Sequence, residues 1–146
     1  MKKFVFFVAA LWLLNACSLN AVDPDAEVKE QACEFAEAYF NYDFIKARRF
    51  VTPESEKWLR FAASNVTQED VALMNATSRT VSIAATDCYH QNDSTVCVMA
   101  TVYNAVMKDS IGQPAHVAEA AKFTLTLVRR GDKYQVRMEC PIRSRI

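Results

Sequence analysis

The chain has 146 residues, of which 51% are hydrophobic and 11% aromatic, with only two glycines and four prolines. This length and composition suit one domain with a packed core and exclude disordered and collagen-like classes. The 17 basic and 17 acidic side chains balance, so the charge gives no sign of nucleic-acid binding or of attraction to anionic lipid headgroups.

Residues 1–16 have the form of an export signal. Two lysines follow Met1, and residues 4–14 form an unbroken apolar run. As a helix this run is about 16 Å long, whereas the hydrocarbon layer of a bilayer is roughly 30 Å thick, so it is too short to span a membrane. We therefore expect a signal peptide that is removed from the mature protein.

The end of this segment, Leu14-Asn15-Ala16-Cys17, resembles the lipobox of bacterial lipoproteins. The resemblance implies that Cys17 receives a diacylglyceryl group and, after cleavage, an acyl chain such as palmitate. The alternative is ordinary secretion, with cleavage near Ala16 or Ala21.

A lipidated Cys17 would hold the protein close to its membrane. Residues 17–24 would be the tether, and the segment after Cys17 reaches at most about 25 Å, which leaves residues 25–146 as a single domain near the bilayer. Lipoproteins exported to the surface of anaerobic gut bacteria usually have acidic residues just after the cysteine. Residues 18–22 contain none, so we expect the periplasmic face of the outer membrane.

The first half of the domain is predicted to be helical. Apolar residues recur at helical spacing from Asp25 to Tyr42, with glutamates largely on the opposite face. Asp43 can cap a short helix over residues 44–49, whose Phe44, Ile45 and Ala47 we expect to point inward.

Two further capping patterns predict two more helices. Thr52-Pro53-Glu54 begins a helix that reaches about Ala63 and buries Trp58. Thr67-Gln68-Glu69-Asp70 begins a last helix that ends near Asn75.

From residue 77 onward the apolar period changes to two, which predicts four antiparallel strands. A turn at Asn92-Asp93 would place the following residues opposite one another: Ile83 and Val102, Ala85 and Ala100, Tyr89 and Val96. A turn at Gly131-Asp132 would pair Phe123 with Cys140, Leu125 with Met138, and Leu127 with Val136. Helices followed by a sheet indicate an α+β domain with N-terminal helices packed on a four-stranded antiparallel sheet.

Four cysteines remain after lipidation, so three disulfide connectivities are possible in an oxidising compartment. The first hairpin register favours Cys88 with Cys97 as an opposed pair, which leaves Cys33 with Cys140. The alternative is four free thiols. Closely spaced cysteine ligands are absent and the chain has only two histidines, so we expect no metal site.

This order of elements in a small lipoprotein resembles the nuclear transport factor 2-like (NTF2-like) fold, a cone of curved sheet around a long helix. The resemblance is closest to small lipoproteins of anaerobic gut bacteria and is carried by three short strings: Phe40-Asn41-Tyr42-Asp43-Phe44-Ile45-Lys46-Ala47, Asp109-Ser110-Ile111-Gly112 and Lys133-Tyr134-Gln135-Val136-Arg137-Met138. That group implies no particular activity. Isomerase-like and cyclase-like enzymes with this fold use an acid or base inside the cone.

Five residues are candidates for lining such a cone: Tyr39, Trp58, Asp87, Asn104 and Glu119. Asp87 is the candidate acid, because a carboxyl held among apolar neighbours would have a raised pKa, as acid–base catalysis at neutral pH requires. The alternative is that sheet twist exposes Asp87 to water. Trp58 and the aromatic residues of the first helices are explained first as core residues, ahead of a ligand-binding set.

We therefore expect a lipid-anchored cell-envelope domain that binds a small ligand or a protein partner without catalysis and without a cofactor. One alternative is a small isomerase-like or cyclase-like enzyme that uses Asp87. Another is a homodimer formed through the outer sheet face. Ser94 and Ser110 occupy triplets that resemble O-glycosylation acceptors in those bacteria.

Overall fold

The computed structural model describes residues 22–78 and 80–142. The helices are α1 (Ala26–Phe40), α2 (Phe44–Ala47), α3 (Glu56–Ser64) and α4 (Gln68–Ala76), with short 3-10 turns η1 (Arg48–Phe50) and η2 (Pro53–Ser55). The strands are β1 (Ser82–Asn92), β2 (Thr95–Met107), β3 (His116–Arg130) and β4 (Lys133–Arg137). The expected signal peptide over residues 1–16 and the expected lipidation site Cys17 lie outside the described residues.

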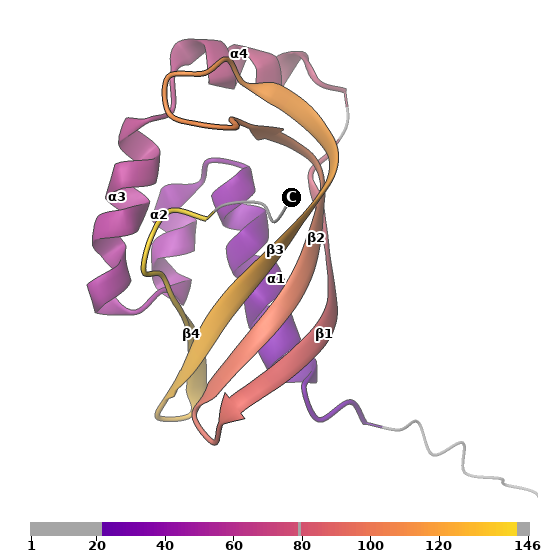
Figure 1. Ribbon diagram of the computed structural model, residues 1–146, viewed down its shortest axis with the longest axis vertical. Coiled ribbons are helices and arrows are strands. Elements are labelled where there is room, and N and C mark those ends of the chain that lie inside the picture. The colour runs from indigo at the N-terminus through magenta and orange to yellow at the C-terminus, as the bar shows by residue number, and fades with distance from the viewer. Residues whose placement is uncertain (1–21, 79, 143–146) are drawn as a thin grey trace, which may run out of the picture.

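The helices lie on one side of a single antiparallel sheet with strand order β1-β2-β3-β4 (Figure 1). The strands bend, and α1 lies on the inner side of the bend, where it contacts β1 and β2. Helices α2 and α3 form a second layer outside α1 (Figure 1). The predicted α+β class is confirmed, and the arrangement is the one that the NTF2-like resemblance implied.

The core fills the space between α1 and the sheet. Phe35 is fully buried on α1, and the ring of Phe40 lies 4.7 Å from that of Phe123 on β3. Leu125 and Val136 are 2% and 1% exposed, as the alternation of apolar residues predicted. Each such side chain contributes about 1.5–3 kcal/mol when it leaves water, so this interface is the main source of stability.

Two of the predicted helix starts are confirmed by hydrogen bonds to their capping side chains, whereas Thr52 makes no such cap and Pro53 begins the 3-10 turn η2 ahead of α3. The Asp43 side chain accepts from the Lys46 amide at 2.9 Å, and Thr67 and Asp70 form a reciprocal capping box. The inward orientation expected for Ile45 is wrong, because 83% of this residue is exposed. Helix α2 has only four residues, and Ala47 and half-buried Phe44 already occupy its inner side.

The register predicted for the first hairpin is correct at one end and wrong at the other. Ile83 pairs with Val102 and Ala85 with Ala100, as expected. A bulge between Ala85 and Asp87 then inserts one residue, which moves the β1 side chains from Asp87 to His90 to the face opposite the predicted one. The expected pairing of Tyr89 with Val96 is therefore replaced by one with Cys97. A second register shift between His90 and Asn92 places the turn at Asp93-Ser94, one residue later than predicted.

The second hairpin turns at Gly131-Asp132 and pairs Leu127 with Val136, both as predicted. Gly131 has φ +65°, a conformation that favours glycine. Strand β4 ends at Arg137, so the two further predicted pairs, Phe123–Cys140 and Leu125–Met138, do not form.

The segment before α3 covers the free edge of β4. Val51 forms a parallel bridge with Val136, and the Ser55 hydroxyl accepts from the Met138 amide at 2.8 Å. The same hydroxyl lies 2.8 Å from that of Thr52, so this buried polar pair is satisfied. These contacts fix the start of α3 against the sheet.

Candidate functional site

The four cysteines of the domain are free, so neither predicted disulfide is present. The bulge in β1 explains the first correction, because it places Cys88 opposite Val98 rather than Cys97. Burial raises the pKa of the Cys88 thiol. Cys33 is half-buried. Cys140 is exposed and follows the end of β4, so the strand pairing that was expected to bring it toward Cys33 on α1 does not form.

The bulge also moves the candidate acid. Asp87 pairs with Met99 rather than Val98 and is exposed on the outer face of the sheet. The burial that a catalytic Asp87 required is therefore missing, in line with the alternative in which water reaches this carboxyl.

Tyr39 and Trp58 lie in the helical layers and belong to aromatic clusters. The Tyr39 ring lies 5.7 Å from those of Phe35 and Phe44, and burial raises the pKa of its phenol to about 12. A phenol with this pKa stays neutral and is no base at neutral pH. Trp58 is half-buried on α3, with the Phe61 ring 6.3 Å away.

Asn104 and Glu119 line neither of the two hollows described below, so they share no cavity there with Tyr39 or Trp58. Asn104 has φ +59° on β2, and its amide donates to the Thr80 carbonyl at 3.3 Å, which makes it a structural residue of a strand irregularity. Glu119 is exposed on β3. The five pocket candidates thus lie on both sides of the sheet and in two helical layers.

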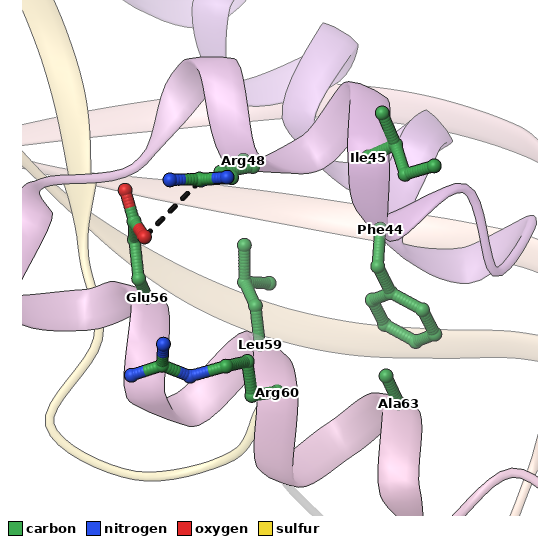
Figure 2. A pocket seen from close by; sticks show the side chains of 7 residues that line it. All are labelled: Phe44, Ile45, Arg48, Glu56, Leu59, Arg60 and Ala63. Atoms are coloured by element: carbon green, nitrogen blue, oxygen red, sulfur yellow. Dashed lines mark ion pairs between the residues drawn. The ribbon is translucent and has the colours of Figure 1, made fainter.

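A groove in the helical layer, which was not predicted, combines apolar and charged side chains. It lies between α2 and α3 and has a volume of about 240 Å³. Its lining residues are Phe44, Ile45, Arg48, Glu56, Leu59, Arg60 and Ala63. Figure 2 shows Leu59 pointing from α3 toward α2, with Phe44 on one side of it and the Arg48–Glu56 ion pair on the other.

The charges of this α2–α3 groove are only partly paired. The Arg48 Nε lies 3.1 Å from a Glu56 carboxylate oxygen, which neutralises both groups. Exposed Arg60 makes neither an ion pair nor a hydrogen bond with any part of the chain that the structure describes. The groove therefore keeps one unpaired positive charge beside an apolar floor.

The sequence carried a signal for the exposed isoleucine of this groove, although not for the groove itself. Lys46, Arg48 and Arg49 flank Ile45 closely, so the segment is too short and too basic to be buried on all sides. An isolated isoleucine among basic residues on a four-residue helix indicates an exposed apolar side chain. That Ile45 and Arg60 line the same groove depends on how α3 crosses α2, which periodicity does not encode.

A second hollow lies at the far end of the sheet and is more polar. It has a volume of about 300 Å³, and its charged lining residues are Lys108, Asp109, His116 and Lys122. His116 and Asp109 are 3.9 Å apart, and both side chains are more than half exposed. Over residues 22–78 and 80–142, no three His, Cys, Asp or Glu side chains gather as metal ligands would.

The two residues predicted as glycosylation sites lie at the surface. Ser94 is exposed in the first hairpin turn, and Ser110 is exposed in the connection between β2 and β3.

Among the described residues no helix is long and apolar enough to cross a membrane.

Comparison with known proteins adds little to this description. No family model matches the sequence, and no curated protein matches it. A solved structure described as an "Ntf2 like protein involved in plasmid conjugation" is 17% identical, with a TM-score of 0.45. The match covers 87% of this chain but only 42% of that one, so the chain spans less than half of that protein.

Proposed function

We propose that the protein is a non-catalytic docking domain, held by a lipid on Cys17 at the periplasmic face of the outer membrane, that binds a protein partner through the α2–α3 groove. One observation carries the proposal: exposed Ile45 adjoins an apolar groove beside the unpaired charge of Arg60. Exposed apolar surface next to polar groups is typical of interaction sites.

The interior of the fold favours docking over catalysis. Phe35 and Phe123 fill the space between α1 and the sheet, where the expected cone would have held a substrate. Asp87 lies on the other side of the sheet from Tyr39, so the acid–base alternative lacks the geometry that it needs. A binding site on the outside of the helices requires no cavity in the core.

The membrane anchor is supported by the lipobox alone. We expect labelling with an alkyne analogue of palmitate in the wild-type protein and none after Cys17→Ala. Labelling that persists in this variant would contradict the anchor.

Docking through the groove can be tested in the cell by a photoreactive amino acid at position 45. We expect a discrete adduct that disappears when Arg60→Glu is added. The matched control places the same group at position 89, because Tyr89 is 69% exposed on the opposite side of the sheet. An identical adduct from both positions, or one that is insensitive to Arg60→Glu, would argue against the groove.

A homodimer through the outer sheet face is a second candidate. Tyr89, Met99 and Tyr103 are 69%, 40% and 39% exposed on adjoining strands, and their register places all three on that face. Light scattering of the full chain in detergent tests it, with Met99→Lys as the disrupting variant. A monomer in the wild type at high concentration would exclude this candidate.

A further inference from the structure

We infer that the α2–α3 groove takes an acidic peptide segment that presents a large aliphatic side chain. The inference rests on the proposed docking function and adds to it the chemistry of the partner. Three features of the groove carry it: its size, its exposed isoleucine and its unbalanced charge.

The size of the groove selects a side chain rather than a whole small molecule. Pockets for drug-sized ligands have volumes of about 300–1,000 Å³ and enclose most of the ligand. The α2–α3 groove has about 240 Å³ and an apolar floor of Phe44, Leu59 and Ala63. This space suits one large aliphatic side chain inserted from a segment that runs over the surface.

The exposed isoleucine extends the apolar contact beyond the floor of the groove. Ile45 is 83% exposed at the edge (Figure 2). A peptide that inserts one side chain against Leu59 would lay its neighbouring residues across Ile45. The apolar area of the site therefore continues along the peptide, and a ligand that fills only the floor of the groove would leave most of this isoleucine in water.

The charges select carboxylates beside that aliphatic residue. The α2–α3 segment, residues 44–64, has five basic and two acidic side chains. Both acidic groups have partners within the chain, because Glu56 contacts Arg48 and Glu54 lies 3.0 Å from Arg130. Arg60 remains available, and a guanidinium prefers a carboxylate in a two-point contact.

The same charges act against a basic partner. A lysine-bearing segment would meet Arg60 directly, and the carboxylate that lines the groove, Glu56, already contacts Arg48. Specificity therefore comes from repulsion as well as attraction. The inference commits to an acidic protein segment as the occupant, rather than to a membrane surface or a nucleic acid.

The test uses the full chain in lipid nanodiscs and a fluorescent synthetic peptide with two adjacent leucines flanked on each side by two glutamates. We expect this peptide to bind, and to bind at least tenfold more weakly to Ile45→Glu and to Arg60→Glu. The matched controls are Ile111→Glu and Arg129→Glu, two exposed positions elsewhere that should leave binding unchanged. A peptide with serines in place of the leucines should not bind. A peptide with lysines in place of the glutamates should bind to Arg60→Glu but not to the wild type.

Equal binding of the acidic and lysine peptides, equal binding to wild type and Arg60→Glu, or no binding of the acidic peptide would overturn the inference. The in-cell adduct at position 45 separates this failure from that of the docking function. If the adduct persists and depends on Arg60 while the acidic peptide fails, docking stands and the partner chemistry is wrong. If the adduct is also absent, both are wrong.

Discussion

Lys108→Met should destabilise the domain by about 3 kcal/mol, because it removes the cation of a buried ion pair. Asp70 on α4 is 2% exposed, and its carboxylate lies 2.6 Å from the Lys108 Nζ and accepts from the Thr67 amide at 2.8 Å. Loss of one partner of a buried pair costs about 3–5 kcal/mol. The low end applies here, because the Lys108 side chain is 21% exposed and water can reach the site.

The effect should depend on pH in a defined direction. Burial by itself raises the pKa of Asp70, but hydrogen bonds from Lys108 and Thr67 outweigh it and hold the pKa below the ordinary 3.8. A carboxyl with a lowered folded-state pKa contributes its full stability above the unfolded value and loses it as pH falls through the folded value. The difference between wild type and Lys108→Met should therefore be constant above about pH 5 and shrink below pH 3.8.

Urea denaturation followed by circular dichroism at pH 7 and pH 3 measures both effects. Lys133→Met is the matched control, because Lys133 is exposed in β4 and should change stability by less than about 0.5 kcal/mol. A double-mutant cycle with Asp70→Asn should give a coupling of about 1–3 kcal/mol. A Lys108→Met variant as stable as Lys133→Met at pH 7, or an equal loss at both pH values, would refute the reasoning.

Three further predictions concern single side chains. Ser55→Ala should cost about 1–3 kcal/mol in urea denaturation, because the Met138 amide loses its buried acceptor; a loss below 0.5 kcal/mol would contradict this. Ile45→Ser should change stability by less than about 0.5 kcal/mol, because the Ile45 side chain is 83% exposed and packs little within the fold. The same substitution should weaken partner binding by about 2 kcal/mol, roughly 30-fold by fluorescence titration. Asp87→Asn should leave both properties unchanged, and a change in partner binding or in any turnover would return this residue to the site.

Much of the fold can be predicted from local sequence patterns, namely apolar periodicity, helix-capping residues and turn residues. The period of two placed Leu125 and Val136 inside, and the capping residues Asp43 and Thr67 marked helix starts to within a residue. Gly131 marked its turn because few other residues adopt φ +65° without strain. These features depend on neighbours in sequence, so periodicity and turn chemistry are sufficient.

The candidate site could not be predicted in the same way. No glycine or proline marks the bulge between Ala85 and Asp87, yet this single inserted residue moves Asp87 to the other face of the sheet and separates Cys88 from Cys97. The α2–α3 groove depends on where two helices cross, and Arg60 becomes its free charge only because Arg48 has already taken Glu56. Such relations between distant segments leave no local pattern.

The central claim is that partners bind outside the helices while the core stays filled. Methyl NMR of the full chain in nanodiscs, titrated with the acidic leucine peptide, tests this most directly. We predict shifts of the Ile45 and Leu59 methyl signals and none at Val98 or Leu125, which lie between α1 and the sheet. Shifts at Val98 and Leu125 with Ile45 unchanged would place the ligand in the interior and contradict the account.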